Sequence, residues 1–176
     1  VRRNIKHFLL PQIQTELHET IAVEILLENG SSIKITSAYM PGIPNTKSPM
    51  LFAKDIRKLT KGNTSYFVCG DFNARHRHWN CLRANRVGNI LYDEYCQNNF
   101  LIKQPATPTR FPASAQQNPS TIDLVLTNGL HQMSEPVCHA LSSDHNAVSF
   151  SIFTEHKHER NAERLSFDFR NADWDK

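Results

Sequence analysis

The stretch Ser65-Tyr66-Phe67-Val68-Cys69-Gly70-Asp71-Phe72-Asn73-Ala74 decides how this chain is expected to fold. Its first half, Ser65–Cys69, is a short and almost entirely apolar run, which is typical of a strand that is buried on both faces of a sheet. Asp71 and Asn73 follow at the C-terminal end of that run. We therefore expect a central strand whose end presents a carboxylate and an amide.

The residues before this stretch predict a hairpin and then a helix. Ile21–Glu28 and Ile33–Met40 are rich in β-branched and aliphatic residues, and Asn29-Gly30 between them forms a turn that tolerates positive φ. Pro41 ends the second strand. From Pro49 to Thr60 apolar residues recur at helical spacing, which predicts a surface helix.

The residues after the stretch predict a mixed α/β pattern. Arg75–Asn85 lacks periodicity and is expected to be an ordered loop, whereas the spacing from Val87 to Phe100 predicts an amphipathic helix that ends near Asn98. Asp144 and His145 are expected in a loop between the last two strands. The expected short elements and strands are Leu101–Lys103, Thr107–Phe111, Ile122–Thr127, Met133–Ala140 and Ala147–Phe153.

Two polar clusters contain the side chains that phosphodiester hydrolysis requires. The reaction needs neutralised phosphate charge, an oriented water and assistance to the leaving oxygen, and carboxylates, a divalent ion and a histidine suit these tasks. Asp71 and Asp144 are candidate ligands for Mg²⁺, which prefers oxygen, if their loops meet at one sheet edge. Taken alone, Asp71–Ala74 is better explained as a turn, and Ser143-Asp144-His145 could be a cap or surface turn.

Positive charge is concentrated between Lys54 and Arg86. The net charge of +3 would not by itself nominate a nucleic-acid partner. This segment, however, contains 8 basic residues against only 2 acidic ones. Such a run is usually a solvated face, but beside a phosphodiesterase motif it favours contacts from Arg75 and Arg77 to DNA.

Composition limits the class of protein. The 176 residues suit one globular domain, and no run approaches the ~18 apolar residues of a membrane span, so we expect no membrane partner. The four cysteines are widely spaced, so we expect buried free thiols, which favours an intracellular protein of the nucleus or cytoplasm over a secreted one. His76, His78 and Cys81 have loose metal-like spacing, but a DNA-facing or solvated loop is favoured over a zinc site.

Taken in order, the motifs resemble the endonuclease–exonuclease–phosphatase (DNase I-like) superfamily. Asp71–Arg75 followed by Trp79-Asn80, together with Thr107–Phe111, resembles the endonuclease of jockey-like non-LTR retrotransposon polyproteins, which also carry reverse transcriptase. The segment Phe167–Trp174 is similar to the linker that precedes reverse transcriptase in those elements. The superfamily motifs are Ala38-Tyr39-Met40-Pro41, Gly70–Ala74, Thr121–Val125 and Ser143-Asp144-His145.

The resemblance implies an α/β fold, namely a four-layer α/β/β/α sandwich of two mixed sheets flanked by helices. Residues 1–154 would form the endonuclease domain, and residues 155–176 a charged linker toward a covalently linked reverse transcriptase domain. The family's principal metal-binding glutamate and an asparagine lie on strands that precede the hairpin at Ile21. Because nothing here matches those strands, we expect the domain to be N-terminally truncated.

The resemblance also implies roles for individual residues. Asp71 would position and deprotonate the attacking water, and Asn73 would help to hold that water and the phosphate. Asp144 would lie beside the Mg²⁺ or Mn²⁺ ion. His145 would contact the scissile phosphate, while Asp123 accepts its ring N–H and fixes its orientation.

Two more residues are implied at the edge of the site. Tyr39 would form a hydrogen bond to the phosphate, although a strand aromatic packed in the core is the simpler alternative. Asp123 has an alternative role as a capping carboxylate. Arg110 would contact DNA, ordinarily through phosphate and less often by entering a groove.

The function implied by the resemblance is that of a metal-dependent DNA endonuclease that nicks target DNA to prime reverse transcription. Two alternatives remain open. One is a phosphodiesterase or phosphatase of the same superfamily that acts on a phosphoinositide, a sphingolipid or RNA. The other is a catalytically dead nucleic-acid-binding remnant, which the missing glutamate favours.

Overall fold

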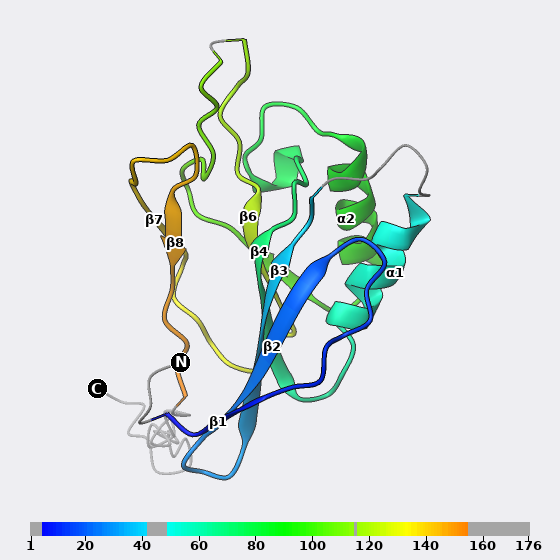
Figure 1. The fold of residues 1–176 in the computed structure, drawn as a ribbon, viewed down its shortest axis with the longest axis vertical. Coiled ribbons are helices and arrows are strands. Elements are labelled where there is room, and N and C mark those ends of the chain that lie inside the picture. The colour runs from blue at the N-terminus through cyan, green and yellow to red at the C-terminus, as the bar shows by residue number, and fades with distance from the viewer. Residues whose placement is uncertain (1–4, 42–48, 115, 155–176) are drawn as a thin grey trace, which may run out of the picture.

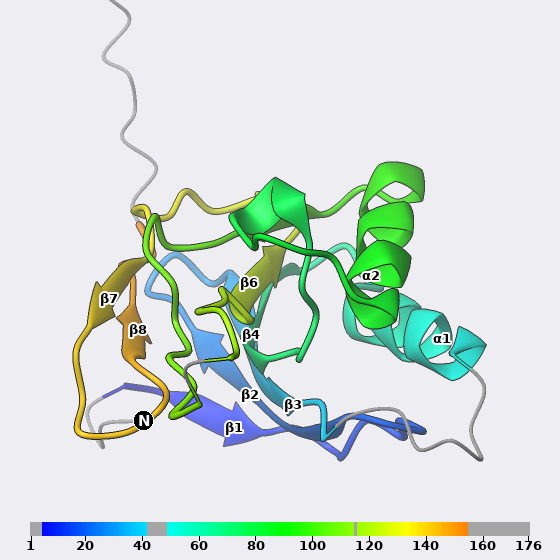
Figure 2. The same ribbon diagram turned by 90° about the horizontal axis from the view of Figure 1, so that it is seen from above.

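A computed structural model describes residues 5–41, 49–114 and 116–154, which form a mixed α/β structure. The larger sheet has six strands in the order β1-β2-β3-β4-β6-β5, and β7 and β8 form a separate two-stranded sheet. Both α-helices lie on one face of the larger sheet and β7–β8 lies over the other face (Figures 1 and 2). The predicted α/β class is confirmed, and the predicted linker at 155–176 lies outside the described residues.

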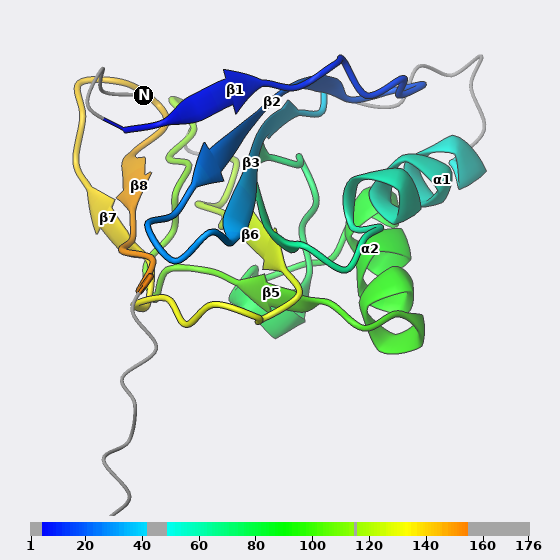
Figure 3. The ribbon, with the colours of Figure 1, turned by 90° about the horizontal axis from the view of Figure 1, so that it is seen from below.

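The expected helices and most of the expected strands are present with shifted ends, whereas Thr107–Phe111 forms no strand and has only isolated bridges at Arg110. Figure 3 shows β1 and β5 at the two edges of the larger sheet. The helices are α1 (Met50–Leu59) and α2 (Arg86–Gln97), and a 3-10 helix, η1, spans Arg77–Trp79. The strands are β1 (His7–Leu9), β2 (Glu19–Leu26), β3 (Ser32–Tyr39), β4 (Ser65–Asp71), β5 (Leu101–Lys103), β6 (Asp123–Thr127), β7 (Val137–His139) and β8 (Ala147–Ser149).

β4 is a central strand that is buried on both faces, as its apolar run predicts. It pairs in parallel with β3 and antiparallel with β6. Tyr66 and Val68 belong to the core cluster that includes residues of α1 and α2. Phe67 alternates with them and packs instead with Ile33 and Val125, in a second cluster against which Phe150 is packed. Both faces of β4 therefore contribute to burial of apolar surface.

The close approach of β3 and β4 requires glycine at position 70. Gly70 has φ +155°, and a Cβ atom placed there would lie 1.8 Å from the carbonyl oxygen of Ala38. A larger residue would push the strands apart at that point. Since Tyr39 and Asp71 are the next pair along these strands, their relative positions depend on this glycine.

Two expected features of the sheets differ in the structure. β1 was not expected, because its three residues are all exposed and show no pattern of burial. The expected strand Met133–Ala140 is reduced to β7, with one further bridge between Met133 and Ile152. Pro136 lies between these parts and has no N–H to donate, which explains why the ladder is interrupted.

The cysteines and the helices bear on two predictions made from composition. The four cysteines are free thiols, as expected, but burial holds only in part, because Cys81 is buried and Cys96 is exposed. No helix in the described ranges has the length and apolarity needed to cross a membrane.

A buried hydrogen-bonded pair, Asp55 and His18, ties the segment before β2 to α1. Asp55 on α1 is fully buried, and its carboxylate accepts the backbone N–H groups of Glu16 (2.9 Å), Leu17 (2.8 Å) and His18 (3.2 Å). The His18 Nδ1 atom is 3.2 Å from the same carboxylate. Burial lowers the pKa of His18 despite the opposing effect of Asp55. Burial opposes ionisation of Asp55, but the backbone amides prevail and lower its pKa.

Both pKa shifts predict that the protein loses stability in acid. The unfolded imidazole binds a proton near pH 6.5 and the folded one only at lower pH, so its contribution declines below that value. The contribution of Asp55 to the free energy of unfolding is fully present above pH 3.8. It is lost as the pH falls through the lower pKa of this carboxyl in the folded protein. We expect the free energy of unfolding, measured by urea denaturation, to fall continuously from pH 7 toward acid.

The substitution Asp55→Asn tests the same pair directly. It should lower the free energy of unfolding at pH 7 by about 3 kcal/mol, because buried donors lose a charged acceptor. Asp93→Asn, at an exposed position of α2, is the matched control and should change it little. Equal effects of the two substitutions would contradict the role assigned to the Asp55 carboxylate.

Candidate active site

Three predicted site residues form one row across the larger sheet. Tyr39 is the β3 partner of Asp71 on β4, and Asp71 is in turn the partner of Asp123 on β6. Paired residues on neighbouring strands project from the same face of a sheet. Phe67 and Val125 share this face by alternation and pack toward β8. The row therefore lies on the face opposite the helices.

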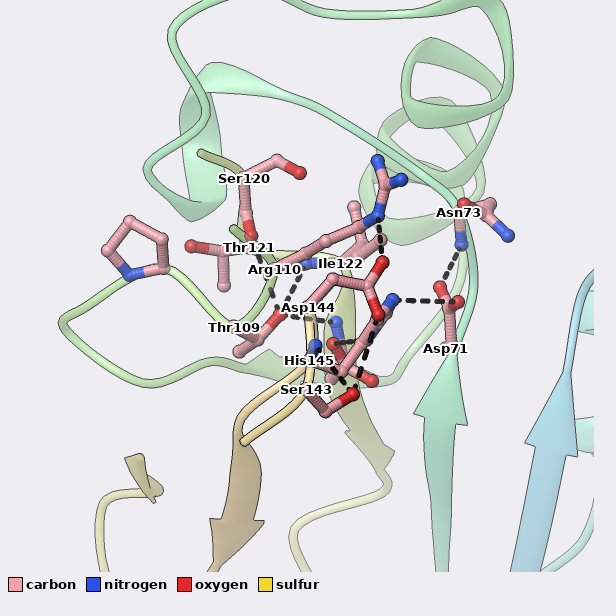
Figure 4. A network of polar contacts seen from close by, with 12 residues as sticks. Asp71, Asn73, Thr109, Arg110, Ser120, Thr121, Ile122, Ser143, Asp144 and His145 are labelled. Carbon is pink, nitrogen blue, oxygen red and sulfur yellow. Dashed lines mark hydrogen bonds and ion pairs between the residues drawn. The ribbon is translucent and has the colours of Figure 1, made fainter. Parts of the chain in front are cut away.

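His145 joins this row from the loop between β7 and β8. Its Nδ1 atom is 3.1 Å from Oδ2 of Asp123. Its Nε2 atom is 4.0 Å from Oδ2 of Asp71 (Figure 4). A proton on Nδ1 is donated to Asp123, which leaves Nε2 facing Asp71. The structure thus brings together one imidazole and two carboxylates from three separate parts of the chain.

Asn73 shapes the turn that follows β4. Its backbone has φ 46°, in the left-handed region that asparagine tolerates. Its N–H donates to Oδ1 of Asp71 (2.7 Å), and its side-chain amide donates to the carbonyl of Met40 (2.8 Å). The turn suggested as an alternative for this motif is therefore present. It is compatible with the site, since the other Asp71 oxygen faces His145.

The environment of Asp71 favours its protonated form relative to an exposed aspartate. Burial is the largest effect and raises its pKa above 3.8, and the charge of Asp123 raises it further. The N–H of Asn73 and the positive charges of His145 and Arg110 act in the opposite direction but do not cancel the increase. A carboxylate with a raised pKa is a stronger proton acceptor.

Tyr39 is not a core aromatic. Its side chain is exposed, at 46% of the maximum area, although Ala38 before it is buried. The alternative of a packed strand aromatic is therefore wrong. The side chain of Tyr39 is open to solvent in the same row as Asp71.

Asp144 lies beside the row and pairs with Arg110. Its Oδ2 atom is 3.5 Å from Nε of Arg110, and its side chain is 53% exposed. Across residues 5–41, 49–114 and 116–154, no three His, Cys, Asp or Glu side chains are grouped so that they could hold a metal ion. The roles of Asp71 and Asp144 as metal ligands remain predictions.

Thr109 connects the two halves of the site, and the sequence did not single it out. It is fully buried, and its hydroxyl oxygen accepts the N–H groups of Ile122 (3.1 Å) and Asp123 (3.2 Å). Its carbonyl accepts the N–H of Asn146 (2.7 Å). Thr109 thus ties the start of β6 to the His145 loop. The sequence feature that points to this residue is the motif Thr107–Phe111, to which it belongs.

Asn85 connects the loop after Asn73 to α2, and it was also missed. Its side-chain oxygen accepts the N–H groups of Gly88 (2.7 Å) and Arg75 (3.0 Å), and its amide donates to the carbonyl of Asn73 (2.8 Å). An asparagine directly before a helix is a typical N-cap, which is the signal that was available. Of the predicted DNA-binding residues in this loop, Arg75 is half-buried and Arg77 is exposed.

The loop from Ala74 to Cys81 is anchored to the body of the protein. Trp79 is buried and donates its Nε1–H to the carbonyl of Ala74 (3.0 Å), as expected for an anchor. His76 stacks on Tyr92 of α2 with 4.3 Å between ring centroids. Cys81 is buried and faces the carbonyl of Thr121. These contacts hold the loop against α2 and against the segment that precedes β6.

Comparison with known proteins identifies relatives and a fold. A model of the endonuclease-reverse transcriptase family matches residues 33–149, more than half of the chain. The RNA-directed DNA polymerase from mobile element jockey of Drosophila funebris is 26% identical over 147 residues, which are 82% of this chain. They are only 16% of that relative, so the chain spans less than a fifth of its length.

Two solved structures resemble the protein. The endonuclease domain of TRAS1, a telomere-specific non-LTR retrotransposon, has a TM-score of 0.67 at 20% identity, covering 85% of this chain and 67% of that domain. An endonuclease/exonuclease/phosphatase family protein from Leptotrichia buccalis has a TM-score of 0.53 at 16% identity, covering 86% and 61%. At such identities the likeness shows the fold alone, which is that of endonuclease/exonuclease/phosphatase proteins.

The contacts of Thr109 predict different effects of two substitutions. Thr109→Val leaves the N–H groups of Ile122 and Asp123 without their acceptor, which should lower the free energy of unfolding by about 1–3 kcal/mol. Thr109→Ser keeps the hydroxyl and should lose less. Urea denaturation of both variants checks this, and a serine variant as unstable as the valine variant would show that the hydroxyl is not responsible.

The position of Asp71 beside Asp123 predicts how a substitution of Asp123 changes the pKa of Asp71. We expect the Asp71 carboxyl carbon to titrate above 3.8 in a ¹³C NMR experiment. Asp123→Asn should lower that midpoint, because it removes a like charge from the adjacent strand. Asp93→Asn serves as the control and should leave the midpoint in place. A midpoint that rises or stays unchanged in Asp123→Asn would contradict this arrangement.

Proposed function

Since the chain belongs to the endonuclease-reverse transcriptase family, we propose that it forms part of a nuclease that nicks DNA and so supplies a primer end for reverse transcription. One observation supports this proposal most directly. His145 lies between Asp123 and Asp71 in a row at the end of three strands. Such an arrangement can orient a histidine against a phosphate and place a carboxylate near the attacking water.

In the proposed reaction each side chain acts at a stated atom. Asp71 takes a proton from a water molecule that attacks phosphorus, and Asn73 helps to hold that water. The P–O bond to the 3′ oxygen breaks, and this oxygen takes up a proton from solvent and becomes the 3′ hydroxyl of the primer end. His145 interacts with the phosphate oxygens and stabilises the charge that develops on them, while Asp123 keeps its ring in place through Nδ1. Tyr39 donates its hydroxyl to the phosphate from the neighbouring strand.

Mg²⁺ or Mn²⁺ remains the proposed cofactor, with Asp144 and Asp71 as proposed ligands. Mg²⁺ is usually bound by one or two carboxylates, with water and substrate oxygens as its other ligands, so these two residues suit it. We assign no step of the reaction to the ion.

The proposed substrate is DNA. Arg75 and Arg77 follow the catalytic turn directly and lie in the basic segment from Lys54 to Arg86. Such residues neutralise backbone phosphates without reading sequence. The relatives are named RNA-directed DNA polymerases, which supports a reverse transcriptase domain in the same polypeptide as a proposed partner.

A second candidate is a nucleic-acid-binding domain that does not cut. The lack of a three-member metal-binding group among the described residues favours it. It shares the basic segment with the first candidate, so binding alone does not separate the two.

A plasmid assay tests the proposed chemistry. We expect the protein to convert supercoiled plasmid to the open circular form with Mg²⁺ but not with a chelator. Asp71→Asn and His145→Ala should each reduce the rate by about 10²–10⁴-fold, because each removes a group that acts on the reacting atoms. Asp93→Asn is the control for loss of a carboxylate and should keep the rate.

Each other result of this assay has a definite meaning. Cutting that survives both substitutions would reject the assignment of Asp71 and His145. Binding of DNA that weakens steeply with salt, without cutting in Mg²⁺ or Mn²⁺, would support the second candidate. Release of phosphate from a phosphoinositide by protein that leaves plasmid intact would favour another activity of the same superfamily.

A further inference from the structure

Backbone pairing places Arg110 next to His145. The N–H of Arg110 donates to the carbonyl of Ser120 (2.9 Å), and the N–H of Ser120 donates back to Arg110 (3.0 Å). On its other side Arg110 forms an antiparallel bridge with His145. Residues that pair directly across two strands project from the same face. The side chains of Arg110 and His145 are therefore neighbours because of the fold, independently of any contact between them.

The bridge is fixed by flanking hydrogen bonds. The N–H of Phe111 donates to the carbonyl of Asp144 (2.7 Å), and the N–H of Asn146 donates to the carbonyl of Thr109 (2.7 Å). Thr109 is itself held to the start of β6. Arg110 and Ser120 form the base of a loop that projects beyond the end of the sheet (Figure 1). The position of the Arg110 backbone is thus set by the same hydrogen bonds that set Asp123 and His145.

The Arg110 guanidinium is held at the site by a single ion pair. Its Nε atom is 3.5 Å from Oδ2 of Asp144, and its terminal nitrogens point away from that carboxylate (Figure 4). Within the described residues Asp144 is its only ion-pair partner. The Arg110 side chain is 24% exposed, so the guanidinium is accessible but its position is restricted.

The charge balance of the site explains why a cation is needed there. Asp71, Asp123 and Asp144 are carboxylates that surround His145, and a phosphodiester that approaches this histidine is itself an anion. Like charges at this range disfavour binding. Arg110 is positively charged at every relevant pH, and its planar fork of donors matches two phosphate oxygens at once.

We propose that Arg110 binds the DNA phosphate that lies against His145, and that Asp144 holds the guanidinium in position until the phosphate replaces it. This proposal rests on the proposed function and gives Arg110 a more specific role than a general contact to DNA phosphate, because it assigns the phosphate that lies against His145. It makes Asp144 a positioning residue for Arg110 in the protein without substrate. The ligand is a backbone phosphodiester, so the contact is independent of base sequence.

Binding of a labelled DNA duplex in the presence of EDTA tests the proposal, because no cutting is needed. We expect Arg110→Gln to weaken binding about 10- to 100-fold, which corresponds to loss of a charge-assisted hydrogen bond. The slope of log affinity against log salt should become shallower by about 0.9, the value for one phosphate contact. Arg110→Lys should recover part of the affinity, because it restores the charge but not the fork.

Asp144→Asn predicts a change of the opposite sign. It should tighten binding in EDTA, because the guanidinium loses its competing partner and the site loses a negative charge. Lys6→Gln is the control for loss of a surface cation. Lys6 directly precedes β1. The first residue of β1 is paired through β2 and β3 with the start of β4, whereas Asp71 is at the end of β4, so Lys6 lies toward the opposite end of the strands from the site. Thermal melting of every variant confirms that binding is measured on folded protein.

The results distinguish this proposal from the proposed function. Arg110→Gln that binds like Lys6→Gln, or Asp144→Asn that binds more weakly than the unmodified protein, would overturn the role of Arg110 while leaving the nicking assay unaffected. If Arg110→Gln melts too early to be measured, the Arg110→Lys and Asp144→Asn results decide the question. Absence of any DNA binding by the unmodified protein would overturn both proposals.

Discussion

The register of β4 against its two neighbours is the constraint on which the candidate site depends. Tyr39, Asp71 and Asp123 form one row only because β3, β4 and β6 are paired as they are. A shift of one residue would turn each of these side chains to the opposite face, since strand side chains alternate. Alternate residues of β4 are buried in the two core clusters on opposite faces of the sheet. A shift by one residue would move each of them into the wrong cluster, which opposes the shift. Gly70 permits the close pairing at the position just before the row.

The same face of the sheet serves packing at one end and chemistry at the other. Phe67 and Val125 pack toward β8, whereas Asp71 and Asp123 meet the loop that carries His145. The apolar end holds the two sheets together, and the polar end therefore receives a loop whose position is already restricted. A raised Asp71 pKa follows from this arrangement, because partial burial and a neighbouring carboxylate act together.

The segments around the site are joined by neutral hydrogen bonds rather than by the charged groups. Thr109 connects β6 to the His145 loop, and Asn85 connects α2 to the turn after Asp71. The side chains of Arg110 and His145 are consequently available for a ligand. The Oδ2 atom of Asp71 is available as well, whereas its Oδ1 atom accepts the N–H of Asn73. The ion pair between Arg110 and Asp144 is the exception, and its long distance and exposure make it easy to replace.

The sequence by itself determined the elements and the residue types of the site. The apolar run Ser65–Cys69 predicted β4, the spacing of apolar residues predicted both helices, and the order of motifs indicated the family. The resemblance also predicted the contact between Asp123 and His145. Only the tertiary structure decided that Arg110 is bridged to His145 and that Thr109 supports the segments that carry these residues. The reason is physical: periodicity reports how one segment is buried, whereas contacts between distant segments depend on strand register and on hydrogen bonds between loops.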